Sequence, residues 1–341
     1  MRVALVLGVA AALRCPARRP LAVHRRSVAA LGAPRETDSE GGGVETLAPD
    51  AAVATLGLVT ALWGSQHAVT KLALSSGDDL AASLTALRFF VAAAATAPFF
   101  PDDAATRAAG AELGLWAFLG FAFQTVGLET TTATRSAFLL YLNVKFVPLL
   151  EVAGKKPLPR GTWPSAACAL LGTGLLASDA GGLDGGPAWV VGDSWSVLAA
   201  LASACFIVRL DRYANLDAAP LTAASAAATG ALAALWLCAS GGLDGGAPPT
   251  AEVCGAALYL GLVPSALCGF LQARAQRSVP PARAAVVYAT DPLWAAAFAY
   301  AALGERLGPN GLAGAAAIAA AAFGQRLLLR EDAGDGGATV D

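Results

Sequence analysis

Residues 134–143 read TRSAFLLYLN and residues 282–291 read ARAAVVYATD, so one pattern recurs 148 positions later, with an arginine second in each copy. A further pair recurs at an offset of 150, namely GKKPLPRG at 154–161 and GERLGPNG at 304–311. Each closing segment is followed by a helix-length stretch rich in Ala, Gly and Leu. The sequence therefore predicts two copies of one structural unit within the chain.

The composition restricts the class of protein that these copies build. Of the 341 residues, 56% are hydrophobic and 14% are charged, with a mean hydropathy of +0.57. A soluble domain carries about 25% charged residues, so we expect much of this surface to contact a lipid bilayer. The net charge of −2 gives no attraction to nucleic acid. The six cysteines show no CxxC spacing and indicate small packing residues rather than metal ligands.

Apolar stretches of 17 or more residues recur from residue 51 onward, each bounded by charge, glycine or proline. A helix of about 20 residues crosses the hydrocarbon core, and backbone groups cannot stay unpaired in lipid. The predicted fold is an all-α integral membrane protein of about ten transmembrane helices, with nine as the alternative count. The expected spans lie near 51–74, 80–100, 112–128, 136–153, 161–177, 191–210, 218–240, 253–272, 284–303 and 308–329.

The charges between the spans predict the orientation of the two copies. Most lysines and arginines between spans fall in loops on the side of the N-terminus, whereas the opposite loops hold only Arg135 and Arg306. This bias places both termini on the cytoplasm-equivalent side. Five helices per copy is an odd number, so the second copy is inverted, and loops 154–160 and 304–310 face opposite compartments. Inverted repeats form a site at their interface near the bilayer midplane, which favours transport over a scaffold.

The N-terminal region is a separate unit. An apolar run at residues 3–13 is too short to span a bilayer and is followed by an arginine-rich stretch without an acidic residue before Glu36. This pattern is typical of a targeting leader and suggests a plastid or other organelle membrane, with a disordered cytosolic arm as the alternative. The predicted organisation is a leader and flexible linker (1–50), a first repeat (51–178), a second repeat (190–330) and a disordered acidic tail (331–341).

Several motifs carry a resemblance to a known family. The first copy contains ALWGSQHAVTKLAL (61–74), ALRFFVAAAATAPF (86–99) and GLETTTATRSAFLLYLN (127–143), and the second has an acidic-Pro pair and a closing LGERL within residues 272–314. With these motifs, residues 52–329 resemble the EamA family of the drug/metabolite transporter superfamily, and most closely its algal and cyanobacterial members. The resemblance implies ten spans, two EamA repeats and export or exchange of small metabolites such as amino acids.

We expect a secondary transporter, an exporter or exchanger of small polar metabolites, that works by alternating access at the repeat interface. No GxxxxGK[ST] loop appears, so a gradient or exchange would drive transport. The alternatives are a non-transporting scaffold or receptor and, less favoured, an intramembrane enzyme, against which stands the lack of HExxH and GxSxG motifs. We expect no catalytic residue, cofactor or metal, a small-molecule substrate and the bilayer as partners, and leave a homodimer open.

Ionisable groups inside spans cost roughly 2.5–3.5 kcal/mol each on insertion scales, so they are candidate functional residues. Lys145 lies deepest among the cations, and Asp291 enters from the opposite side of the bilayer. We expect Lys145 and Asp291 to meet across the repeat interface or to bind the two charges of a zwitterionic substrate. A structural ion pair is the alternative. The repeat aligns Asp291 with Asn143, which is a further candidate.

Polar residues of the first three spans complete the candidate site. His67 and Lys71 follow Trp63 at intervals of four, so the three share one helix face that would suit a cavity wall. Histidine side chains in general change charge near neutral pH, so His67 could couple transport to protons, or it could be structural. Lys71 is close enough to the span end to reach the surface instead. Gln124 is a candidate polar lining residue, whereas Arg88 is expected to extend its side chain to the surface.

Three prolines lie inside predicted spans: Pro148, Pro264 and Pro292. Each removes one backbone hydrogen bond and frees the carbonyl four residues earlier. The resulting kinks could serve as gating hinges. Static kinks that only improve packing are the alternative.

Overall fold

The computed structural model describes residues 46–77, 80–131, 136, 139–154, 158, 162–179, 191–241, 249–303 and 308–335, and all regular structure in them is helical. The first half contains α2 (Pro49–Leu74), α3 (Ala81–Thr96), α4 (Ala104–Thr130), α6 (Asn143–Ala153) and α7 (Thr162–Asp179). The second half contains α8 (Val191–Arg212), α9 (Ala218–Ala239), α10 (Ala251–Leu260), the π-helix η3 (Gly261–Leu267), α11 (Cys268–Ala275), α12 (Pro281–Tyr288), α13 (Asp291–Leu303) and α14 (Pro309–Asp335). Short 3₁₀ turns follow α3 and α11.

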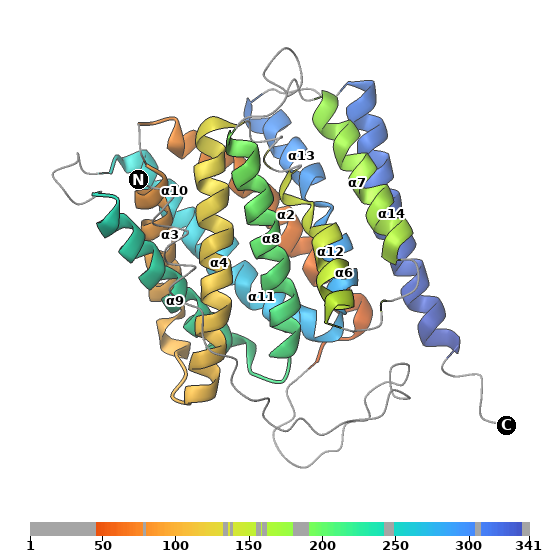
Figure 1. Cartoon of the computed structure of the whole chain (residues 1–341), viewed down its shortest axis with the longest axis horizontal. Helices are drawn as coiled ribbons and strands as arrows, with labels where there is room; N and C mark the ends of the chain where they lie inside the picture. Colours follow the sequence, from red (N-terminus) through yellow and green to blue (C-terminus); the bar gives the residue numbers. More distant parts are fainter. Residues whose placement is uncertain are drawn as a thin grey trace.

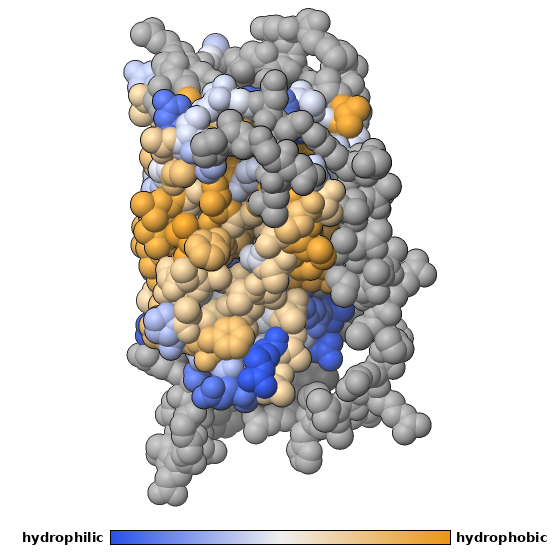
Figure 2. Space-filling view, turned by 90° about the vertical axis from the view of Figure 1, so that its left-hand side faces the viewer, coloured by the Kyte–Doolittle hydropathy of each residue, from blue (hydrophilic) through white to orange (hydrophobic). Residues whose placement is uncertain are grey.

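The helices form a bundle with an apolar belt. Five of the described helical segments are long and apolar enough to cross a membrane, judged by length and composition. One face of the molecule shows a band of hydrophobic residues between hydrophilic ends (Figure 2). Large apolar side chains such as Phe90 (71% exposed), Leu235 and Leu258 point outward instead of into the core. Such exposure is unfavourable in water and expected in lipid, and it confirms the prediction of an all-α membrane protein.

The helices agree with the predicted spans to within a few residues, apart from two ends. The third span begins at Ala104 rather than at residue 112, because Asp103 caps α4 by accepting a hydrogen bond from the backbone N–H of Thr106 at 2.7 Å. The last helix continues to Asp335, so the prediction of disorder is wrong for residues 331–335. The leader up to residue 45, residues 336–341 and much of loops 154–160 and 304–310 lie outside the described residues.

The fourth and ninth spans are each broken in the middle. A turn at residues 141–142 precedes α6, and a turn at 289–290 separates α12 from α13. With the 148-residue offset of the repeat, the two turns fall at equivalent positions, and Asn143 and Asp291 begin the half-helices that follow them. Pro292 therefore lies in the first turn of α13, where a missing N–H breaks no bond. The prediction that Pro292 interrupts the interior of a continuous helix is therefore wrong.

The other two prolines do lie inside helical segments, Pro148 in α6 and Pro264 in η3. Around Pro264 the eighth span loosens into a π-helix, a common response to an interrupted backbone ladder. The Leu260 carbonyl, which the proline frees, accepts a hydrogen bond from the Ser265 hydroxyl at 2.9 Å. The Pro264 carbonyl accepts one from the indole N–H of Trp63 at 3.1 Å. The second of these bonds ties the interrupted helix to α2 of the other half.

The contacts between the halves follow a twofold pattern. The helix α4 packs on α8 and α9, and its counterpart in the second half, the α10–η3–α11 segment, packs on α2 and α3. The pair α2–α13 likewise corresponds to the pair α8–α6. Two further pairs are their own counterparts: α3–α9 and α7–α14, the second of which forms one edge of the bundle (Figure 1). Two interlocked copies of a five-helix unit produce this arrangement.

Close contacts across this interface depend on glycine. A Cβ atom added at Gly110 of α4 would lie 2.2 Å from the Cβ of Ala224 in α9. At the corresponding contact in the other copy, a Cβ added at Gly261 of η3 would lie 2.6 Å from the carbonyl oxygen of Arg88 in α3. Small residues let helices approach closely in membranes, and each copy has a glycine at such a contact.

A polar cluster joins the halves at one end of the bundle. Arg209 of α8 pairs with Glu112 of α4, with 3.1 Å between Nε and Oε1. The hydroxyl of Tyr213, which follows α8, donates a hydrogen bond to the same carboxylate. Burial, together with this hydrogen bond, raises the pKa of Tyr213 to about 12, so Tyr213 remains a neutral donor at physiological pH.

Candidate functional site

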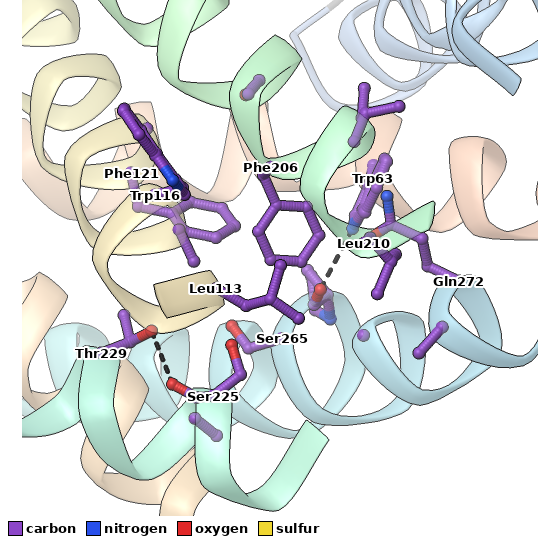
Figure 3. A pocket seen from close by; sticks show the side chains of 18 of the residues that line it. Trp63, Leu113, Trp116, Phe121, Phe206, Leu210, Ser225, Thr229, Ser265 and Gln272 are labelled. Atoms are coloured by element: carbon purple, nitrogen blue, oxygen red, sulfur yellow. Dashed lines mark hydrogen bonds between the residues drawn. The ribbon is translucent and has the colours of Figure 1, made fainter. Parts of the chain in front are cut away.

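A cavity of about 130 Å³ lies between the two halves and is lined by residues of α2, α3, α4, α8, α9, η3, α11 and α12 and of the break before α6. Aromatic side chains form much of its wall, with Trp63, Trp116, Phe121 and Phe206 around the space (Figure 3). Its polar lining residues include Gln66, Gln124, Tyr141, Asn143, Ser265 and Gln272. None of the described lining residues is Asp, Glu, Lys, Arg or His. The wall therefore offers aromatic faces and neutral hydrogen-bonding groups.

A buried carboxylate lies behind this wall. Asp291 is 0% exposed, and its Oδ2 atom is 3.1 Å from Nε2 of His67, itself 2% exposed. The hydroxyl of Tyr141 donates a hydrogen bond to the same oxygen. The other oxygen, Oδ1, has no hydrogen-bond partner among the described residues. Oδ2 therefore has two polar partners, and Asp291 is the first residue of α13.

The imidazole of His67 links this carboxylate to the cavity. Its Nδ1 atom is 3.3 Å from Nε2 of Gln124. With the Gln124 amide assigned this way, Nδ1 accepts a hydrogen bond and the ring proton resides on Nε2, from which it is donated to Asp291. Gln124 and Tyr141 line the cavity, whereas His67 and Asp291 do not. A continuous chain of polar contacts therefore starts and ends at the cavity wall and passes through the buried pair.

The predicted contact between Lys145 and Asp291 is wrong. Lys145 is exposed, and Asp291 contacts His67 instead. The reason is helical phase. Asn143 lines the cavity, and a residue two positions later in an α-helix points to the opposite side. Asn143 and Asp291, which the repeat aligns, do occupy equivalent positions, because each follows the helix break of its own repeat. Of the two, Asn143 lines the cavity and Asp291 does not.

The face of α2 that carries Trp63, His67 and Lys71 serves three separate purposes. Trp63 lines the cavity, and His67 contacts Asp291 behind it. Lys71 donates from Nζ to the carbonyl oxygens of Leu128 at 2.7 Å and Thr131 at 3.1 Å. A cation is favourable at these terminal carbonyls of α4. Lys71 thus neither lines the cavity, as one prediction had it, nor extends to the surface.

The expectation that Arg88 reaches the surface is also wrong. Its side chain is buried, at 5% exposure, and its Nε donates to the Ser265 hydroxyl at 2.7 Å. Its Nη2 donates to Oε1 of Gln66 at 2.8 Å, and the guanidinium carbon lies 4.2 Å from the centroid of the Phe121 ring. The sequence did contain a signal for this position. Arg88 lies deep in its predicted span, and charged residues inside a membrane are functional candidates by default.

Comparisons with known proteins agree with this architecture. Residues 190–325 match the EamA-like transporter family. An uncharacterized transporter of Archaeoglobus fulgidus is 38% identical over 101 residues, which cover 28% of this chain and 30% of that protein. The chain thus spans less than a third of this curated relative's length.

A solved crystal structure has the same fold, with a TM-score of 0.67 and 19% sequence identity, and the match covers 83% of this chain and 99% of that one. At this identity the likeness extends to the fold alone. The family match identifies the second half of the chain, residues 190–325, as an EamA-like transporter domain.

Proposed function

We propose that the chain is a secondary transporter, an exporter or exchanger of small polar metabolites such as amino acids, and that it works by alternating access. The match of residues 190–325 to the family supports this activity. The cavity between the two halves is the proposed binding site of the substrate. The two repeats, 51–178 and 190–330, would rock against each other about this cavity. Asn143 and Gln124 would contact the substrate as neutral hydrogen-bonding groups.

The observation that carries the proposal is the buried His67–Asp291 pair with its two polar links to the cavity. Burying an ionised carboxylate costs several kcal/mol unless it is well paired, so its retention inside a membrane protein indicates a function. A proton added to His67 would occupy Nδ1, which then requires an acceptor from Gln124. The Gln124 amide would have to turn, and the change of protonation would thereby alter the cavity wall.

The interrupted helices are the proposed moving parts. The breaks at residues 141–142 and 289–290 place two half-helix starts beside the cavity and the buried pair, as in transporters built from inverted repeats. Pro148 and Pro264 interrupt the backbone ladder within α6 and η3 and would serve as hinges. Pro292 would act differently, by fixing the start of α13 next to Asp291.

The proposal includes a cellular setting. The partners are a small-molecule substrate and the lipid bilayer, and the arginine-rich leader would direct the protein to a plastid or other organelle membrane. A fluorescent fusion to residues 1–50 tests this location, and a cytosolic signal would contradict it. A homodimer remains an open part of the proposal, which chemical cross-linking in native membranes would test.

Reconstituted protein tests the proposed activity. We expect saturable uptake of at least one labelled amino acid or related metabolite into proteoliposomes, driven by an imposed pH gradient, and exchange against internal substrate without a gradient. Asp291→Asn should abolish gradient-driven accumulation and leave exchange in place. A scaffold or receptor would give no saturable flux with any metabolite, and equal accumulation by the wild type and Asp291→Asn would contradict the coupling role.

A further inference from the structure

Arg88 holds a buried positive charge next to the cavity, and its direct partners are all neutral. The two hydrogen bonds from its guanidinium go to a hydroxyl, in Ser265, and an amide oxygen, in Gln66. The aromatic rings of Phe89 and Phe121 lie 5.4 and 4.2 Å from its central carbon. Arginine stays protonated in proteins, so none of these partners cancels its charge.

No carboxylate of the described residues forms an ion pair with Arg88. Asp291 is held by His67 and Tyr141, and the buried Cys268, which interacts electrostatically with Arg88, is a neutral thiol in its ordinary form. Buried charges in proteins are normally paired with an opposite charge. An arginine inside a membrane protein that lacks such a partner is therefore a candidate to receive one from a ligand.

The guanidinium also has donors to spare and lies directly behind side chains that line the cavity. A guanidinium has five N–H groups, of which one at Nε and one at Nη2 are used, so both N–H groups of Nη1 have no hydrogen-bond partner among the described residues. The two hydrogen-bond partners of its guanidinium, Gln66 and Ser265, line the cavity, and so do the two rings beside it, those of Phe89 and Phe121. Arg88 thus lies one layer of neutral side chains behind the cavity wall.

We propose that the cavity takes an organic anion, whose carboxylate pairs with Arg88 while its body lies between the aromatic side chains. Planar two-point pairing with a carboxylate is the geometry that arginine favours. At another part of the wall, Oδ1 of Asn143 accepts no hydrogen bond in the described structure and would accept one from a donor on the substrate. This assignment of substrate class rests on the proposed function, in which the cavity is the transport site.

A purely structural arginine would behave differently. In that case the stacking on Phe121 and the bonds to Gln66 and Ser265 would be its whole role, and substitution would lower stability without regard to the charge of the ligand. Matched ligands that differ in charge alone separate the two roles. Benzoate and benzamide form such a pair, since they share a planar ring and differ in carboxylate against neutral amide.

The test is equilibrium dialysis of labelled benzoate and benzamide against the purified full chain in detergent. The wild type should bind benzoate roughly tenfold or more tightly than benzamide, the difference expected of a charge-assisted hydrogen bond. Arg88→Gln should lose this preference and bind benzamide as the wild type does, while Arg88→Lys, which keeps the charge, should retain part of it. Arg209→Gln, at the half-exposed ion pair with Glu112, is the matched control and should bind both compounds normally.

Equal binding of the two compounds by the wild type would overturn the proposal, even if Arg88→Gln fails to fold. A benzoate preference that survives in a folded Arg88→Gln protein would also overturn it. Flux measurements on the same proteins separate this inference from the proposed function. Benzoate binding without any saturable flux would refute transport alone, and flux limited to neutral compounds would refute the anion assignment alone.

Discussion

Asn143 and Asp291 occupy equivalent positions in the two repeats, yet their surroundings differ. Each is the first residue of a half-helix that follows a two-residue break. Asn143 lines the cavity, and its Oδ1 accepts no hydrogen bond from described residues. Asp291 lies behind the wall and contacts His67 and Tyr141. The repeat thus supplies the same backbone interruption twice, with an amide at the cavity wall in one copy and a buried carboxylate behind the wall in the other.

This comparison suggests how a symmetric scaffold acquires an asymmetric function. Two copies of a broken helix create the space at the interface, and neither copy alone surrounds it. In the proposed function, the carboxylate of one copy would serve coupling and the amide of the other would contact the substrate.

Asp291→Asn makes the two half-helix starts alike and should have the largest effect. Without the carboxylate the buried site cannot change its charge, so accumulation against a pH gradient should be lost, as measured by uptake into proteoliposomes. Asp193→Asn is the matched control. Asp193 is also fully buried in the first turn of its helix, where it accepts a hydrogen bond from Thr131, but Thr131, unlike the Asp291 partner Tyr141, does not line the cavity. Its replacement should leave coupling intact in the folded fraction.

Asn143→Asp alters the opposite side and should weaken binding of an anion. A negative charge at the cavity wall would repel benzoate, and at an effective dielectric constant near 20 the loss should be roughly tenfold. Binding of benzamide should change much less. Equilibrium dialysis of both compounds measures the effect, and an unchanged benzoate affinity would show that Asn143 is remote from the bound ligand.

The equivalence of the copies extends to their packing, which Gly110→Ala and Gly261→Ala test. Each added methyl group would overlap atoms of the facing helix, and overpacking of this kind costs about 1–3 kcal/mol. Both variants should therefore lower the thermal midpoint in detergent. Gly255→Ala, where an added Cβ meets nothing within 4 Å, should leave it nearly unchanged. A large effect in one copy alone would argue against equivalent interfaces.

Lys145→Met should have the smallest effect. Lys145 follows Asn143 by two residues and is exposed on the other side of α6. Transport and coupling should therefore match the wild type, because substitutions on an exposed surface usually have small effects. Uptake into proteoliposomes, normalised to the protein incorporated, is the measurement. Loss of transport in the folded variant would restore Lys145 to the site.

The sequence was sufficient to predict the membrane fold, and part of the candidate site followed from it. Length, hydropathy and the repeated motifs predicted helices close to those observed, because lipid leaves the backbone few other choices. His67, Gln124 and Asp291 were identified as polar residues deep in spans, and they do form one connected cluster. Asn143 followed from its alignment with Asp291 across the repeat.

The errors have a common physical cause, which is that the depth of a residue in a span does not reveal its direction. Lys145 is deep in its span but points away from the interface, because the break at 141–142 sets the phase of α6. No glycine or proline marks that break. Arg88 points inward to Gln66 and Ser265, which belong to two different helices. Such tertiary partners cannot be read from a single span.

The most direct measurement of the central claim, that both repeats enclose a cavity reached in turn from each side, is side-specific labelling of one cysteine. Ser225 of α9 lines the cavity, and Ser225→Cys in a variant without the native cysteines would report access to it. A membrane-impermeant maleimide should label this position when added from either side of sealed vesicles, and bound substrate should slow both reactions. Labelling from one side only, with or without substrate, would contradict the account.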